Sequence, residues 1–200
     1  MKLGLWVVAA AGVGVACFVI QAPPESLGSH PSLETYPPNA LPLRLPLVRP
    51  SLVVFKGARR LELSSDGKVV RRYRVGLGGK PIGDKRLECD RRTPEGTYTI
   101  RLKNPNSLYT LSLGLDYPGV KTAARGLRDG RIDQAMHDAI VAAHKAGRMP
   151  PQKTALGGEI FIHGKGSASD WTWGCIALDD EAITELFMAV PTGTPVVVKP

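Results

Sequence analysis

The chain has 200 residues, 43% of them hydrophobic and 22% charged, which is enough apolar material for one ordinary domain. This composition argues against a disordered tail and a multi-span membrane protein, and three cysteines are too few for a disulfide scaffold. The net charge of +8 is concentrated in residues 56–103. It indicates an anionic partner, such as nucleic acid, lipid headgroups or a carboxylate-rich substrate.

The first 22 residues are typical of an export segment, either a signal peptide or a membrane anchor. Lys2 precedes an uncharged apolar run over residues 3–20, which is longer than the ~7–15 residues of a usual signal core and close to the ~20 that span a bilayer. An incomplete lipoprotein motif ends at Cys17, so an uncleaved anchor, lipidation and a cleaved signal all stay open. Each alternative places the remainder in the periplasm or cell envelope. This argues against nucleic acid as a partner and makes the inner membrane a partner of this segment.

Residues 23–50 form a proline-rich segment with few charges. Such a composition favours an extended chain and disfavours a helix. We expect a linker that holds a domain over residues 51–200 away from the membrane, although a leader without a role has the same composition.

Short β-type runs dominate residues 51–200. An Asp66-Gly67 turn separates two of them, and later runs alternate apolar with polar residues. We expect strands at 52–55, 61–63, 69–75, 96–102, 108–115, 159–162 and 196–198.

Two short helices are predicted within this domain. Apolar residues at helical spacing run from Ile132 to Ala143, with Asp129 as a candidate cap. A second helix begins after Asp179 or Asp180 and ends before Pro191. The sum is a mainly β domain with two short helices.

The candidate chemistry lies in a histidine and a cysteine that follow apolar segments. His163 ends the strand predicted at 159–162, and Cys175 comes twelve residues later, directly after Gly174. A thiol needs a base to become nucleophilic near neutral pH, and a glycine allows backbone N–H groups to approach a substrate carbonyl. On residue types alone, a packed structural cysteine is the commoner role.

A series of motifs over about residues 51–200 changes that balance. It comprises Asp84-Lys85, Thr93-Pro94-Glu95-Gly96, Ile162-His163-Gly164, Asp170-Trp171-Thr172-Trp173-Gly174-Cys175 and Gly193-Thr194-Pro195. In this order the motifs resemble the L,D-transpeptidase catalytic (YkuD-type) family, and the Asp-Trp-Thr-x-Gly-Cys form is similar to its murein transpeptidase or hydrolase branch. The chain departs from many members of the family at three positions. Trp173 stands where they have histidine, Ala177 where they have arginine, and Cys89 where they often have glycine.

The resemblance implies an L,D-transpeptidase-type β-sandwich and a cysteine transpeptidase acting on peptidoglycan stem peptides through a thioester. Cross-linking of two stems at their third residues, attachment of an envelope lipoprotein and D-amino-acid exchange are the implied reactions. A carboxypeptidase or hydrolase that releases D-alanine or lipoprotein is the alternative, and a non-catalytic wall-binding module is a second one. No cofactor and no metal are implied.

The resemblance also implies the roles of individual residues. Cys175 is the expected nucleophile and His163 its base, with the backbone N–H groups of Trp173, Gly174 and Cys175 as oxyanion donors. Further candidates for substrate binding are Gly164, Arg92, Thr172, Trp171 and Asp170. Asp170 is also a candidate for orienting His163, and a regulatory disulfide between Cys89 and Cys175 is a separate hypothesis.

Overall fold

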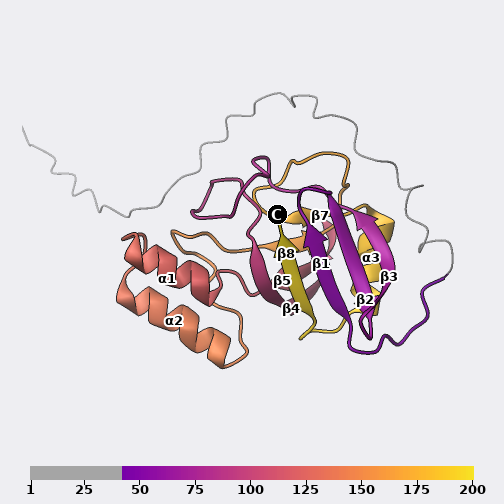
Figure 1. The fold of residues 1–200 in the computed structure, drawn as a ribbon, viewed down its shortest axis with the longest axis horizontal. Coiled ribbons are helices and arrows are strands. Elements are labelled where there is room, and N and C mark those ends of the chain that lie inside the picture. Colours follow the sequence, from indigo (N-terminus) through magenta and orange to yellow (C-terminus); the bar gives the residue numbers. More distant parts are fainter. Residues whose placement is uncertain (1–41) are drawn as a thin grey trace, which may run out of the picture.

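The computed structural model describes residues 42–200 (Figure 1). The predicted export segment and the linker up to residue 41 lie outside the described residues. Within residues 42–200, no helix has the length and apolar character needed to cross a bilayer. Leu43 and Leu47, which belong to the predicted linker, pack against the main hydrophobic core.

One curled sheet of eight strands forms the body of the described chain, in the order β3-β2-β1-β8-β4-β5-β6-β7. The strands are β1 Ser51–Phe55, β2 Arg60–Ser65, β3 Lys68–Arg74, β4 Gly96–Ser107, β5 Thr110–Leu115, β6 Phe161–His163, β7 Ile176–Ala177 and β8 Pro195–Lys199. The long β4 joins the two halves, because its first residues pair with β8 and its later residues pair with β5. The mainly β fold class predicted from the sequence is confirmed.

Local sequence signals explain why the strands form where they do. Asp66 and Gly67 both adopt positive φ (48° and 76°), as the tight turn between β2 and β3 requires. In β1, Leu52 and Val54 point into the core while their neighbours are half-buried. This alternation is the period-two pattern that the sequence displays.

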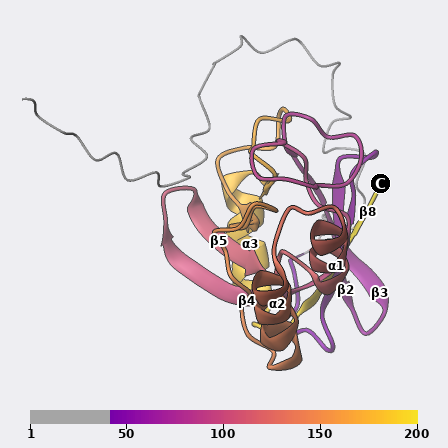
Figure 2. The same ribbon diagram turned by 90° about the vertical axis from the view of Figure 1, so that its left-hand side faces the viewer.

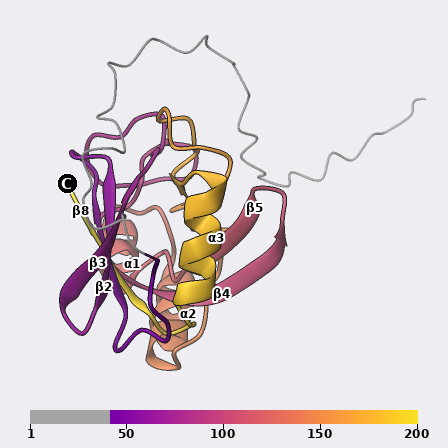
Figure 3. The same cartoon turned by 90° about the vertical axis from the view of Figure 1, so that its right-hand side faces the viewer.

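The described residues contain three helices rather than the two expected. They are α1 Val120–Arg128, α2 Gln134–Lys145 and α3 Asp180–Ala189. Helices α1 and α2 lie side by side on one flank of the sheet (Figure 2). Helix α3 runs along the sheet next to β5 (Figure 3) and buries Ile183 and Leu186 in the core.

Helix α1 escaped prediction because its buried face consists of small residues. Thr122, Ala123 and Gly126 are the residues it buries. A Cβ on Gly126 would lie 2.6 Å from a methyl group of Leu156, so close packing explains a residue of low helix propensity there. The expected cap Asp129 is in fact the C-cap of α1. Asp133 caps α2, and its carboxylate accepts a hydrogen bond from the Met136 N–H at 2.8 Å.

The pairing of β6 with β7 brings the two chemical motifs together. These strands are parallel, with Ile162 opposite Ile176 and His163 opposite Ala177. Cys175 therefore lies directly before β7, and β7 is the neighbour of β6, which ends at His163. The long loop between β6 and β7 returns the chain to this edge of the sheet.

Candidate active site

Cys175 sits at the end of a turn that only glycine permits at the preceding position. Gly174 has φ 134°, and a Cβ there would lie 2.7 Å from the carbonyl oxygen of Arg92. The hydroxyl of buried Thr172 accepts from the Gly174 N–H at 3.1 Å and donates to the Cys175 carbonyl at 2.8 Å. The side chain of Thr172, a candidate for substrate binding, therefore shapes the turn that presents the thiol.

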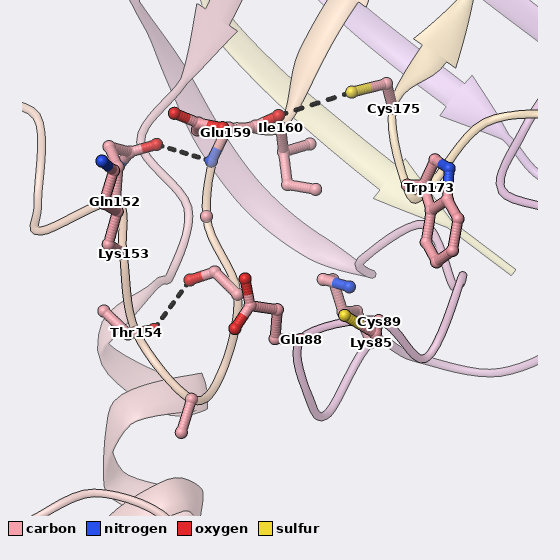
Figure 4. A pocket seen from close by; sticks show the side chains of 13 residues that line it. Lys85, Glu88, Cys89, Gln152, Lys153, Thr154, Glu159, Ile160, Trp173 and Cys175 are labelled. Carbon is pink, nitrogen blue, oxygen red and sulfur yellow. Dashed lines mark hydrogen bonds between the residues drawn. The ribbon is translucent and has the colours of Figure 1, made fainter. Parts of the chain in front are cut away.

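The Cys175 thiol faces a cavity of about 710 Å³ (Figure 4). Its Sγ lies 3.4 Å from the backbone carbonyl of Glu159, to which it donates, and 3.4 Å from the backbone N–H of Phe161. Burial raises the pKa of Cys175 to about 11, although the Phe161 N–H counteracts this shift. The thiol is consequently protonated near neutral pH and needs a base in order to attack a substrate.

His163 is buried at the end of β6, and its ring is held by a backbone group. Its Nδ1 lies 2.7 Å from the carbonyl oxygen of Gly164. Because a carbonyl oxygen can only accept, Nδ1 carries the proton and Nε2 keeps its lone pair. Burial lowers the pKa of His163, with the Gly164 carbonyl acting in the opposite direction. The imidazole is therefore neutral near pH 7 and has one basic nitrogen.

Two aromatic side chains flank this imidazole. Its ring centroid lies 4.6 Å from that of Tyr109 and 5.6 Å from that of Trp171. The indole N–H of Trp171 donates to the Gly166 carbonyl at 3.1 Å. Trp171, a candidate for substrate binding, thus fixes the ring of His163 by packing.

His163 ends β6 and Cys175 directly precedes the neighbouring β7, without a hydrogen bond between their side chains in this state. The described partners of the thiol are backbone groups of Glu159 and Phe161, just before His163 along the same segment. Catalytic hydrogen bonds often form only once substrate is bound. The arrangement places a neutral thiol and a neutral base at one edge of the sheet, and His163 is not among the residues that line the cavity in front of the Cys175 thiol.

Asp170 does not orient His163, contrary to the hypothesis from the sequence. Its carboxylate receives Nε and Nη2 of Arg59 at 2.6 to 3.0 Å and the backbone N–H of Leu77 at 2.9 Å. The Asp170 side chain is 0% exposed. It fastens the start of the cysteine turn to the segment before the motif at residues 84–96, and it is not placed to touch a substrate.

The remaining candidates for substrate binding have different surroundings. A Cβ on Gly164 would lie 2.4 Å from Oδ1 of Asp180, so this glycine allows close packing behind the site. Arg92 is half-buried and is not among the residues that line the cavity. Trp173 does line the cavity, and it is 48% exposed.

Only two of the three expected oxyanion donors have a free N–H group. The Gly174 N–H is engaged by Thr172, whereas the backbone N–H groups of Trp173 and Cys175 have no acceptor within residues 42–200. A donor must be free to stabilise negative charge that develops on a substrate oxygen. Trp173 and Cys175 therefore fit that role better than Gly174.

The opposite walls of the cavity were missed by the sequence reasoning. They come from two segments, residues 85–89 and residues 152–160. Lys85 and Glu88 belong to the first segment, and Gln152, Lys153 and Glu159 belong to the second. Gly158 lets the second segment fold tightly, because a Cβ there would lie 1.7 Å from the Gln152 carbonyl oxygen. The Gly157-Gly158 pair before an apolar strand was the available signal for such a wall.

Most arginines of the basic segment hold the fold together instead of forming a solvated face. Ion pairs join Arg59 to Asp170 and Arg71 to Glu185. Glu62 forms ion pairs with Arg60 and Arg72. The net charge of this segment is therefore a weaker sign of an anionic partner than it first suggests.

The hypothesis of a Cys89–Cys175 disulfide is not supported by the structure. Both residues line the cavity, but Cys175 is a free cysteine. Among the described residues, no group of three or more histidine, cysteine, aspartate or glutamate side chains is arranged to hold a metal ion.

The sequence model of the L,D-transpeptidase catalytic domain (YkuD) matches residues 49–198. The chain belongs to this family. No curated protein matches the sequence.

Several solved structures are similar to the chain. The helical cell shape determining protein Pgp2 of Campylobacter jejuni is 24% identical, with a TM-score of 0.53 over 76% of this chain and 47% of that one. Bd1075 of Bdellovibrio bacteriovorus is 21% identical (TM-score 0.49, 76% and 48% covered), and an L,D-transpeptidase of Mycobacterium smegmatis is 14% identical (0.46, 76% and 59%). The chain thus spans about half the length of these proteins.

Proposed function

We propose that the chain is an exported enzyme of the cell envelope that cleaves peptidoglycan stem peptides and transfers the acyl group from its cysteine to an amine. The observation that carries the proposal is the pair formed by a free, protonated thiol at a cavity and a neutral imidazole on the neighbouring strand. Membership of the L,D-transpeptidase family supports the choice of substrate class.

In the acylation step, Nε2 of His163 accepts the Cys175 proton as Sγ attacks the carbonyl carbon between a diamino acid and D-alanine. The backbone N–H groups of Trp173 and Cys175 donate to the oxyanion that forms. When the carbon–nitrogen bond breaks, His163 returns the proton to the amine of the departing D-alanine. The product is a thioester on Cys175.

In the second step, an acceptor amine attacks the thioester carbonyl and His163 takes the proton that the amine loses. Breaking of the carbon–sulfur bond then leaves a thiolate, which recovers this proton. An amine from a second stem gives a cross-link, an amine of a lipoprotein gives attachment, and a free D-amino acid gives exchange. Water in the same position gives the carboxypeptidase or hydrolase reaction.

The test is incubation of the full chain, in detergent, with purified disaccharide tetrapeptides, followed by mass analysis. Dimers, exchange products or tripeptides each identify an acceptor. Cys175→Ala is the control and must abolish every product while its circular dichroism spectrum stays unchanged. Binding of tetrapeptide by the wild type without any product contradicts the proposal and favours the wall-binding module.

A further inference from the structure

Arg91 carries a guanidinium group that the described fold does not neutralise. Within residues 42–200, its buried Nε has no hydrogen-bond partner and its side chain forms no ion pair. Leaving a buried donor of a charged group unpaired costs free energy, on the order of 1–3 kcal/mol. By contrast, Arg59 and Arg71 of the same basic segment are paired with carboxylates.

The backbone of Arg91 adds a second cost. The residue has φ 57°, in the left-handed region that favours glycine. Its carbonyl accepts from the Lys80 N–H at 3.0 Å, so the conformation is fixed by neighbouring chain. Two unfavourable features on one residue beside a reactive site are typical of a residue retained for function.

The surroundings hold the guanidinium in one place. Its Cζ lies 5.3 Å from the ring centroid of Trp173, a cation–π contact. On another side it packs on Gly79, where a Cβ would lie 2.4 Å from Nη2. The stack exists because Gly79 has no side chain.

Like Arg92, Arg91 is not among the residues that line the cavity. Its guanidinium lies against a wall residue, because Trp173, on which it stacks, lines the cavity together with Cys175. The residue as a whole is half-buried, so it is not sealed from solvent. A guanidinium stays charged at all working pH values, and its planar donors match a carboxylate.

We propose that Arg91 binds a carboxylate of the stem peptide and thereby determines which stems the enzyme accepts. The inference rests on the proposed function and assigns to Arg91 the role that the sequence reasoning gave to Arg92. Two carboxylates have the required chemistry, that of the terminal D-alanine and that of the diamino acid. The experiment separates them.

The first measurement is steady-state kinetics of Arg91→Gln with three tetrapeptides: one with free carboxylates, one with a D-alanine amide and one amidated at the diamino acid. We expect KM for the free substrate to rise roughly 10- to 100-fold with little change in kcat, because a charge-assisted contact is lost. The substrate whose amide abolishes the difference between wild type and variant identifies the bound carboxylate. Arg91→Lys keeps the charge without the planar guanidinium. Its KM for the free substrate should lie between those of the wild type and Arg91→Gln.

Two further variants control for charge and folding. Arg86→Gln removes an exposed arginine from the same segment and should leave KM unchanged. Gly79→Ala keeps Arg91 but displaces its guanidinium, and should raise KM as Arg91→Gln does. Arg91→Gly relieves the backbone conformation, so its melting temperature should not fall. A lower melting temperature in Arg91→Gly with an unchanged KM in Arg91→Gln would overturn the proposal in favour of a structural arginine.

A binding experiment keeps this proposal distinct from the proposed function. In Cys175→Ala, where no chemistry occurs, tetrapeptide should shift the Nε–H resonance of Arg91, and Arg91→Gln in that background should bind roughly 10- to 100-fold more weakly. If the wild type gives no product but this binding is seen, the proposed function fails and the role of Arg91 stands. If products form and the substitutions of Arg91 leave KM unchanged, the proposed function stands and the role of Arg91 fails.

Discussion

Asp170 forms a two-pronged ion pair with Arg59, a residue 111 positions away in the sequence. In the sequence, Asp170 directly precedes Trp171, which packs on His163, and Thr172, which shapes the cysteine turn. The ion pair therefore fixes the start of the segment that carries Trp171 and Thr172, without contact between Asp170 and His163.

We expect Asp170→Asn to lower the free energy of unfolding by about 3 kcal/mol, because breaking a buried pair leaves the Arg59 charge without its partner. Urea unfolding measures this loss. Glu185→Gln is the matched control: it breaks the pair with Arg71, but the Glu185 side chain is 35% exposed and the loss should be smaller. Equal losses in the two variants would show that the Arg59–Asp170 pair stabilises the fold no more than the partly exposed Arg71–Glu185 pair does.

Features encoded within a short stretch of sequence could be predicted, whereas contacts between residues far apart in the sequence could not. The Asp66-Gly67 turn, the alternating strands and the apolar stripe of α2 are visible within short windows, and the structure confirms them. Helix α1 was missed because it buries small residues, which carry little apolar signal.

Distant pairings could not be predicted from local patterns. Nothing near Asp170 indicates that Arg59 will be its partner, and nothing near Arg91 indicates that its guanidinium will lie on Trp173. The cavity wall around Gln152 likewise depends on how a loop folds back on the sheet. His163 and Cys175 were selected as candidates because their types and flanking glycines carry chemistry on their own.

A second prediction concerns the base. His163→Gln should slow thioester formation by about 10²–10⁴, the usual contribution of a positioned general base, while Cys175→Ala abolishes it. Single-turnover acylation by tetrapeptide, followed by intact-protein mass, gives the rate. Acylation of His163→Gln at the wild-type rate would remove His163 from the mechanism.

The pH dependence of thiol reactivity follows from the raised pKa of Cys175, about 11. Because only the thiolate reacts, alkylation by iodoacetamide should increase about tenfold per pH unit from pH 7 to pH 10 and level off near 11. Mass spectrometry of the alkylated protein follows the rate, with Cys175→Ala as the blank. A plateau already at pH 7 would indicate a preformed thiolate and a different resting state.

The lowered pKa of His163 gives a prediction on stability. The unfolded chain binds a proton at this histidine near its ordinary pKa of 6.5, whereas the buried ring resists protonation. Below about pH 6.5 the unfolded state therefore binds more protons, and the free energy of unfolding falls as the pH is lowered. Urea titrations at pH 7.5 and 5 should show a smaller decline in His163→Gln than in the wild type. An identical decline in both would mean that the ring is freely protonated in the folded state.

The last prediction tests the turn that presents the thiol. Gly174→Ala should reduce both stability and acylation, because φ 134° is unfavourable for alanine and the new Cβ would lie 2.7 Å from the Arg92 carbonyl oxygen. Gly166→Ala is the matched control, since Gly166 also has a positive φ of 100° but no atom lies within 4 Å of an added Cβ. The control should show only the conformational cost, of order 1–3 kcal/mol, with acylation by tetrapeptide close to the wild-type rate. Relief of the clash requires the segment of Arg92 to move, and this segment also carries Thr93, whose hydroxyl lies 3.4 Å from the Cys175 carbonyl. If Gly174→Ala acylates as fast as Gly166→Ala, the position of the Cys175 thiol does not depend on the tight approach of these two segments.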